Sequence, residues 1–360
     1  MKNLMKLQTL MLMLFVSSAM ILGSCKKDST TTPTDGDKTA LKALIAESEA
    51  LVNAATTADY PQAAIDNFKT TLQTVKTASA SILTQAQITN LVTQLTEAKK
   101  TFASQQYGFI DESLYLNAGW HFDEGTGTTA TAFSSGHNVG TFTLGDVAIL
   151  GAANAKMPTW ATGVKGGKAI YLNGGAHLEV PYSTAFLPVN LSISVWVKPD
   201  SLYENNYIIS QNYWNGYKLQ TQSGGKPYFT YMKSDGVNII DADNEMDNSI
   251  TANAWNHIVI TLDGTSKLLK FYVNGVLTKT WTETDKIDKG GIGPLTQTLT
   301  PSAQPFMIGC VATDAEIAAN MAWTNASNLG FFCGIIDELK IYNIALTNGQ
   351  VGKLYNDEKP

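Results

Sequence analysis

The sequence is poor in histidine and carries no surplus of basic residues. Its 360 residues include only four histidines, and no two of them have the i, i+4 spacing that puts two zinc ligands on one helix face. Lysine and arginine number 25 against 31 acidic residues, which gives a formal net charge of -6. Nucleic acids and anionic lipid surfaces attract proteins with a basic surplus. We therefore expect neither zinc-dependent catalysis nor a nucleic-acid partner.

Motifs for enzyme catalysis are also missing. The sequence has no Ser-His-Asp or Cys-His nucleophile motif, and no phosphate-binding glycine loop precedes a predicted helix. Asp337 and Glu338 are adjacent on a predicted strand, so they point to opposite faces and we expect a structural role for both. The length and the hydrophobic content of 44% are enough for two or three domains. The sequence thus predicts a multidomain protein that is not an enzyme.

Cysteine is scarce, and the first of the three cysteines ends a segment with the layout of a secretory signal. Lys2 and Lys6 accompany an apolar stretch, 10–16, that is too short to span a membrane. The residues LGSC, which end at Cys25, resemble the lipobox of bacterial lipoproteins. This resemblance implies a signal peptide over residues 1–24 and a lipid on Cys25. The predicted protein is exported and held in the outer membrane by its lipid anchor, at the cell surface.

Residues 25–39 and 40–106 differ in composition. The first segment has no large apolar residue and is rich in Thr, Asp and Pro, which predicts a disordered tether. The second has no glycine, and its apolar residues recur at i, i+3 and i+4 steps in three stretches, which predicts an antiparallel three-helix bundle. Thr84 and Gln87 have the spacing of a capping box before the third helix. This segment resembles FIVAR-type three-helix modules, which implies a spacer.

Between residues 112 and 356 the apolar pattern changes to a period of two. Short apolar runs such as 191–197 and 258–262 are separated by Asn-Gly, Asp-Gly and Gly-Gly turns, which is typical of antiparallel strands. About 245 residues of this kind predict a single sandwich domain of jelly-roll size. The predicted fold class is therefore multidomain α and β, with an N-terminal three-helix bundle followed by an all-β antiparallel jelly-roll sandwich.

Four segments of this region are similar, in content and order, to the laminin-G-like domain of the concanavalin A-like lectin/glucanase superfamily. They are residues 163–181, 191–199, 253–277 and 333–347. The resemblance implies two curved antiparallel sheets and a site for carbohydrate or protein. It also implies a calcium ion in many members and no catalytic activity in most of them.

The acidic run DADNEMD, residues 241–247, is the candidate for metal binding or catalysis. On a strand, its alternating acidic residues would share one face and resemble the E-x-D-x-E strand of glucanases, which hydrolyse with two nearby carboxylates. In a loop, Asp241, Asp243 and Asp247 would offer oxygen ligands to Ca²⁺. A third interpretation is a solvated loop that binds nothing.

Aromatic residues in predicted loops are candidates for sugar binding, because their flat faces can cover the faces of sugar rings and nearby amides can bond to hydroxyls. The candidate ligand-binding residues are Tyr203, Asn212, Tyr213, Trp214, Asn215, Trp281 and Trp323. Trp214 is the first choice because polar residues and a turn flank it. The alternative is that these rings pack at the sheet edges. Trp196, by contrast, alternates with apolar residues on a predicted strand, which predicts a place in the core.

The two remaining cysteines, Cys310 and Cys333, form a single pair in a protein that we expect to be exported. An oxidising compartment favours a disulfide between them. Two buried free thiols are the alternative that the sequence leaves open.

These features together predict a surface lipoprotein that binds carbohydrate and supports polysaccharide capture. The alternative function is a protein-binding adhesin or scaffold module in a surface complex. A glycoside hydrolase is the least favoured interpretation.

Overall fold

The computed structural model describes residues 34–57, 59–300, 303–320 and 330–360. Contacts group them into two compact units, one of residues up to 51 together with 70–97, and one of 52–69 together with 98–360. Among the described residues, no helix combines the length and the apolar character needed to cross a bilayer. The predicted lipidation site, Cys25, lies outside the described residues.

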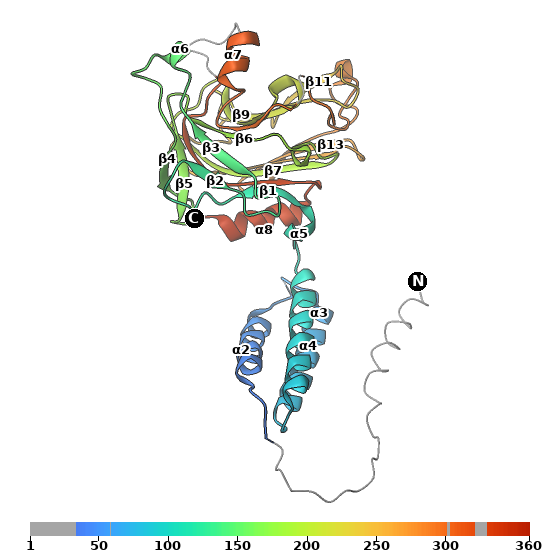
Figure 1. Cartoon of the computed structure of the whole chain (residues 1–360). Coiled ribbons are helices and arrows are strands. Elements are labelled where there is room, and N and C mark those ends of the chain that lie inside the picture. Colours follow the sequence, from blue (N-terminus) through green and yellow to red (C-terminus); the bar gives the residue numbers. More distant parts are fainter. Residues whose placement is uncertain (1–33, 58, 301–302, 321–329) are drawn as a thin grey trace, which may run out of the picture. The chain divides into compact units, whose positions relative to one another are not determined.

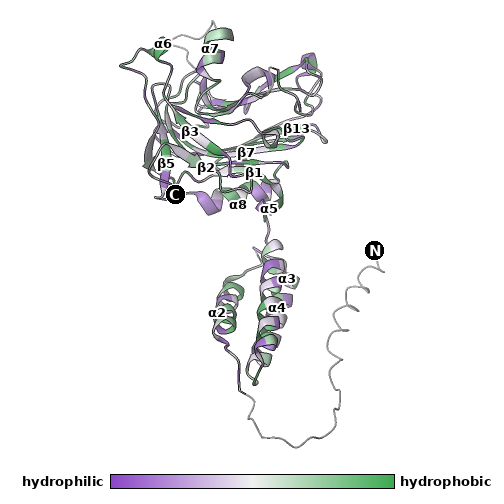
Figure 2. Ribbon diagram, in the orientation of Figure 1, coloured by the Kyte–Doolittle hydropathy of each residue, from purple (hydrophilic) through white to green (hydrophobic). Residues whose placement is uncertain are grey.

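Three helices form where the apolar residues recur with helical spacing, as predicted. They are α2 (Thr39–Ala54), α3 (Gln62–Ser79) and α4 (Gln85–Ser104). Figure 2 shows hydrophobic and hydrophilic residues on each of them. Tyr60 and Phe68 stack on Phe102, with ring centroids 4.2 and 4.7 Å apart. The capping box is confirmed, because the Thr84 N–H donates to Gln87 Oε1 and the Gln87 N–H donates to Thr84 Oγ1. The likeness to FIVAR modules stays a prediction.

Two antiparallel eight-stranded sheets form the predicted sandwich (Figure 1). Sheet A has the strand order β14-β13-β12-β7-β16-β5-β4, with β1 paired to β16. Its strands are β1 (Leu116–Trp120), β4 (Thr159–Thr162), β5 (Lys168–Leu172), β7 (Leu191–Pro199), β12 (Asn256–Asp263), β13 (Leu268–Val273), β14 (Val276–Trp281) and β16 (Gly334–Tyr342).

Sheet B has the strand order β11-β10-β9-β8-β15-β6-β3-β2. Its strands are β2 (Thr129–Thr131), β3 (Val139–Thr143), β6 (His177–Val180), β8 (Asn206–Gln211), β9 (Tyr217–Thr221), β10 (Pro227–Met232), β11 (Ile239–Asp243) and β15 (Phe306–Ile308). The connections carry α5 (Glu112–Tyr115), α6 (Val147–Leu150), α7 (Asp314–Asn320), η1 (Thr184–Phe186), η2 (Tyr213–Asn215) and η3 (Ile287–Lys289).

The main core lies between the two sheets, because alternate residues of each strand point inward. Leu219 and Phe229 of sheet B and Ile193 and Ile336 of sheet A are fully buried members of this core. Figure 1 shows α7 and α8 (Asn348–Glu358) on opposite sides of the two sheets, so each sheet also has a partly covered outer face.

Helix α8 covers part of the outer face of sheet A. Trp196, which we expected in the main core, is buried on this outer face instead, because α8 covers it. Its Nε1 donates to Glu358 Oε2 at 2.9 Å, and its ring stacks on Tyr355 with centroids 5.8 Å apart. Glu358 also pairs with Lys340 of β16. A capping box at Thr347 begins the helix.

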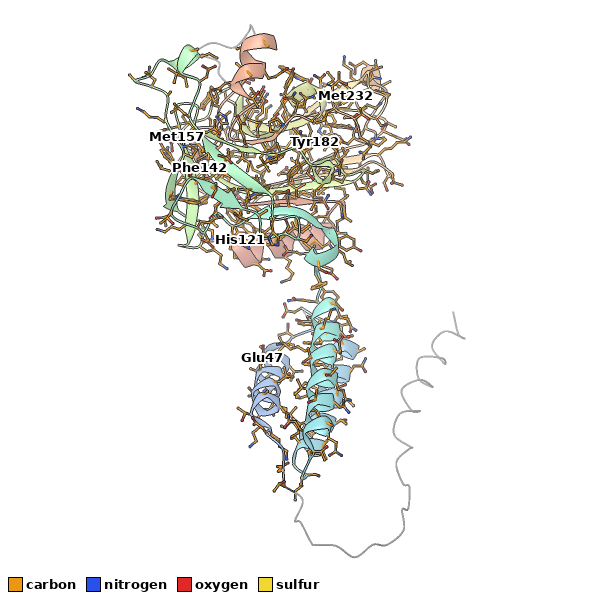
Figure 3. The ribbon with its side chains drawn as sticks, in the orientation of Figure 1. Glu47, His121, Phe142, Met157, Tyr182 and Met232 are labelled. Atoms are coloured by element: carbon orange, nitrogen blue, oxygen red, sulfur yellow. The ribbon has the colours of Figure 1, made fainter. Side chains whose placement is uncertain are left out.

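The expected structural role of Asp337 and Glu338 is confirmed. Asp337 Oδ2 accepts a hydrogen bond from the Val164 N–H at 2.8 Å. Glu338 lies within 2.9 Å of both His121 Nδ1 and Lys340 Nζ. Figure 3 shows His121 on the side of the sandwich where α8 lies. The Asp337 carboxylate therefore anchors the loop at Val164, and the Glu338 carboxylate links His121 to Lys340 of β16. They do not form a facing pair.

The predicted disulfide between Cys310 and Cys333 is not formed, since both cysteines are free. Cys310 pairs with Phe331 in a β-bridge, so Cys333 lies two residues beyond the pairing position. Cys310 Sγ donates to the Ala312 carbonyl at 2.9 Å, while Cys333 Sγ lies 3.5 Å from Asp200 Oδ2. Burial raises the pKa of both thiols, which keeps them protonated at neutral pH.

Candidate functional site

The outer face of sheet B carries polar and aromatic side chains where β9, β10 and β11 lie side by side. Because Leu219, Phe229 and Ala242 point into the core, their neighbours on each strand point to the opposite face. The register aligns these neighbours into two rows across the three strands. One row is Lys218, Thr230 and Asp241, and the other is Gln220, Tyr228 and Asp243.

A cavity of about 640 Å³ lies at this edge of sheet B. Its size falls within the range of small-ligand sites in proteins. Its lining is Lys226, Tyr228, Asp241, Ala242, Asp243, Glu245, Asp247, Trp281 and Lys286. The three predicted metal ligands, which belong to one short run, are therefore brought together with Trp281 of β14 around one cavity.

The acidic run is part strand and part turn. Asp241 and Asp243 lie on β11, so the loop interpretation is wrong for them, whereas Glu245 and Asp247 follow the strand end. Asp241 Oδ1 accepts a hydrogen bond from Thr230 Oγ1 at 2.6 Å. Burial, with a further contribution from the Asp241 charge, raises the pKa of Tyr228 well above its usual range, so its hydroxyl stays a donor.

Lys226 stands between two of these carboxylates. Its Nζ lies 3.1 Å from Asp243 Oδ2 and 3.0 Å from Asp247 Oδ1. Hydrogen bonds from the ammonium to Asp247 and then to Asp243 raise the pKa of Lys226. Glu245 pairs separately with Lys279. Each acidic side chain of the run thus has a partner within the protein.

These contacts bear on the predicted calcium site. Within the described part of the chain, no group of three His, Cys, Asp or Glu side chains is placed to hold a metal ion. Ca²⁺ takes six to eight oxygen ligands at about 2.3–2.6 Å. The carboxylates of Asp243 and Asp247 are instead shared by the ammonium of Lys226, so the residues present do not fit the ion.

Lys218 connects this cavity to Trp214. Its side chain is buried, its Nζ donates to Gln220 Oε1 at 2.9 Å, and it lies 5.0 Å from the Trp214 ring centroid. The same ammonium lies 5.0 Å from the Tyr207 ring and 5.5 Å from the Tyr228 ring. Burial lowers the pKa of Lys218 to about 8. Trp214, on η2, is half-buried beside the lysine.

The other predicted ligand-binding residues near Trp214 make internal contacts. The Tyr213 hydroxyl donates to Glu316 Oε1, and the Tyr203 hydroxyl donates to the Phe331 carbonyl, both at 2.9 Å. Asn212 is buried and donates to the Thr300 carbonyl, whereas Asn215 is half-buried on η2. The polar groups of Tyr203, Asn212 and Tyr213 thus bond to other parts of the protein.

The two remaining predicted tryptophans differ in position. Trp281 is buried, its Nε1 donates to the Asp243 carbonyl at 2.8 Å, and Lys279 and Lys286 lie 4.1 and 4.5 Å from its ring centroid. Its ring therefore already has cations as neighbours. Trp323 lies outside the described residues.

Sequence reasoning missed Lys218, Gln220, Tyr228 and Thr230. The signal was present in the alternation of YKLQT over 217–221 and of PYFTYM over 227–232, which puts polar residues on one face. Lys226 was also missed, because its role depends on two carboxylates that are distant in sequence.

Residues 172–352, just over half of the chain, match the family described as the concanavalin A-like lectin/glucanases superfamily. The chain belongs to this superfamily. A comparison with curated protein sequences gave no significant match.

Solved structures similar to this superfamily member include domain 4 of AbnA, an extracellular GH43 arabinanase from Geobacillus stearothermophilus, in complex with arabinotriose. It is 23% identical, with a TM-score of 0.47, over 67% of this chain and 98% of that one. The binding domain of Paraclostridial Mosquitocidal Protein 1 is 19% identical, with a TM-score of 0.45, over 68% of this chain and 52% of that one. The binding domain of Botulinum Neurotoxin DC in complex with SialylT is 14% identical, with a TM-score of 0.43, over 68% of this chain and 52% of that one. The chain thus spans about half the length of the two toxin domains.

Proposed function

We propose that the protein binds carbohydrate on the outer face of sheet B, between Trp214 and the cavity of the acidic run. The observation that carries this proposal is the pair of cross-strand polar rows, with Trp214 and Tyr228 beside them and a cavity of about 640 Å³ at one end. Sugars present both hydroxyls and apolar ring faces. A surface that combines aromatic rings with donors and acceptors on a rigid sheet suits such ligands.

Each side chain of the proposed site would contribute a different kind of contact to a sugar. Carboxylates of Asp241 and Asp243 accept hydrogen bonds from hydroxyls, while the ammonium of Lys226 and the hydroxyl of Tyr228 donate them. The ring of Trp214 offers a flat apolar surface, and Lys218 beside it holds the ring in place. We assign no catalytic residue in this site.

Export and lipid anchoring at Cys25 form the second part of the proposal. The LGSC sequence before a polar segment supports it. Mass spectrometry of the protein from membranes is expected to show acyl chains on an N-terminal Cys25. Replacement Cys25→Ser should release the protein from the membrane fraction. A Cys25→Ser variant that stays in the membrane fraction would contradict the anchor.

A glycan array followed by isothermal titration calorimetry tests the binding proposal. The purified protein, Trp214→Ala, Asp241→Asn and the control Tyr115→Ala are compared; Tyr115 is an exposed aromatic residue on α5. We expect saturable binding to at least one glycan, with a loss of about tenfold or more for Trp214→Ala and Asp241→Asn only. No binding at millimolar glycan, or equal binding by all variants, would overturn the proposal and favour a protein partner.

A further inference from the structure

Backbone hydrogen bonds hold the segment after β11 against the turn between β9 and β10. The Asn248 N–H donates to the Gly224 carbonyl at 2.8 Å, and the Ile250 N–H donates to the Gly225 carbonyl at 2.7 Å. Gly225 has a φ of +65°, and a Cβ there would lie 2.9 Å from the Ile250 carbonyl oxygen. Only glycine fits this close approach of the two backbones. Lys226 follows directly.

The side chain of Lys226 extends this link to the carboxylates. One ammonium contacts Asp243 at the end of β11 and Asp247 in the following turn, at 3.1 and 3.0 Å. The other oxygen of Asp243 accepts the Glu245 N–H at 2.7 Å, which fixes the carboxylate orientation. The ammonium of Lys226 therefore joins the end of β11 to the following turn, between two of the carboxylates that we predicted as calcium ligands.

We propose that Lys226 takes the place of a calcium ion in this site, so that ligand binding is independent of divalent cations. The proposal rests on the carbohydrate-binding function proposed above and specifies its cation requirement. An ammonium is covalently attached, so it cannot be removed by a chelator, and it carries one charge and three donors. A Ca²⁺ ion at the same place would have to displace this ammonium from both carboxylates before it could use their oxygens as ligands.

Calcium titration by calorimetry and thermal unfolding in Ca²⁺ or EDTA test this proposal on the purified protein. The variants are Lys226→Met and the matched control Lys267→Met, whose lysine pairs with Glu283 in an exposed ion pair. We expect the unchanged protein and the control to show no saturable calcium binding at millimolar concentration, the range of extracellular calcium modules. Lys226→Met frees Asp243 and Asp247, so its Tm should fall by about 3 °C in EDTA and rise again in Ca²⁺.

Saturable calcium binding by the unchanged protein, or a Tm that EDTA lowers, would overturn the proposal. Identical behaviour of Lys226→Met and Lys267→Met would do so as well. If Lys226→Met does not fold, Lys226→Gln replaces it, and the titration of the unchanged protein still decides. Glycan binding is measured separately in EDTA. If the protein binds neither calcium nor glycan, only the carbohydrate proposal is contradicted. If EDTA abolishes glycan binding, the proposal that Lys226 replaces calcium is contradicted.

Discussion

Lys218 is an ammonium group buried on the outer face of sheet B among three aromatic rings. Ring faces attract the cation, but they do not fully replace the water that solvated it. Burial therefore lowers the pKa of Lys218 to about 8, while an unfolded chain holds this proton up to a pKa of about 10.5. Keeping Lys218 charged at neutral pH therefore costs the folded protein free energy relative to the unfolded chain.

The pH dependence of stability follows from this shift. Between pH 8 and about 10.5 the unfolded chain binds more protons at this position than the folded chain, so stability rises with pH. Relative to Lys218→Met, the unchanged protein should gain about 2 kcal/mol in unfolding free energy between pH 8 and pH 9.5. Urea unfolding of both proteins across this range measures the difference. Parallel pH profiles would contradict the prediction.

His121 behaves in the opposite sense. Its hydrogen bond to Glu338 raises the pKa of the imidazole, so the stabilisation is present below about pH 6.5 and is lost as pH rises through the folded pKa. The His121 side chain is 43% exposed, so solvent screening limits the effect to about 1 kcal/mol. We expect His121→Asn to destabilise the protein at pH 5.5 more than at pH 8.5, measured by urea unfolding. Equal destabilisation at the two pH values would contradict this prediction.

At the scale of elements, α8 is held to sheet A by one buried carboxylate. Glu358 receives the Trp196 indole N–H and pairs with Lys340, and all three side chains are buried. Without Glu358, the buried ammonium of Lys340 would lose one of its two carboxylate partners and keep Glu338 at 2.9 Å. The apolar residues Val351 and Leu354 add packing on the same face.

Replacement Glu358→Gln is therefore expected to lower the unfolding free energy by about 1–3 kcal/mol. The neighbouring Asp357→Asn is the control, because the side chain of Asp357 forms an exposed i, i+4 pair with Lys353 worth about 0.2–0.5 kcal/mol. Chemical denaturation of the two variants measures both changes. Equal losses in the two variants would show that Glu358 does not hold the helix.

The same elements show how far sequence reasoning reaches. Period-two patterning predicts the sandwich correctly, because alternation reports which residues of a strand are buried. It does not report what covers each face, so Trp196 was assigned to the wrong side of sheet A. The partners of Lys226 and the separation of Cys310 from Cys333 depend on long-range register, which a single sequence does not display.

At the scale of the whole molecule, the outer faces of the two sheets differ. Sheet A carries α8 on its outer face, while sheet B presents the polar rows and the cavity. We expect residues 109–360 to fold without α2, α3 and α4, because a sandwich of this size has its own core. Thermal unfolding followed by circular dichroism should give a Tm within a few degrees of that of the longer chain. A truncated chain without a cooperative transition would contradict this expectation.

The pairing of β1 with β16 has a mechanical consequence. β1 pairs with β16, which is also paired with β7, so a pull on the chain ahead of residue 116 passes through β1 into a strand inside sheet A. The force is shared by the β1–β16 ladder and its neighbours before it reaches the core. With the proposed anchor at Cys25, tension from a bound glycan polymer would pass through this ladder first. The strands of the proposed binding face belong to the other sheet, outside the direct line of load.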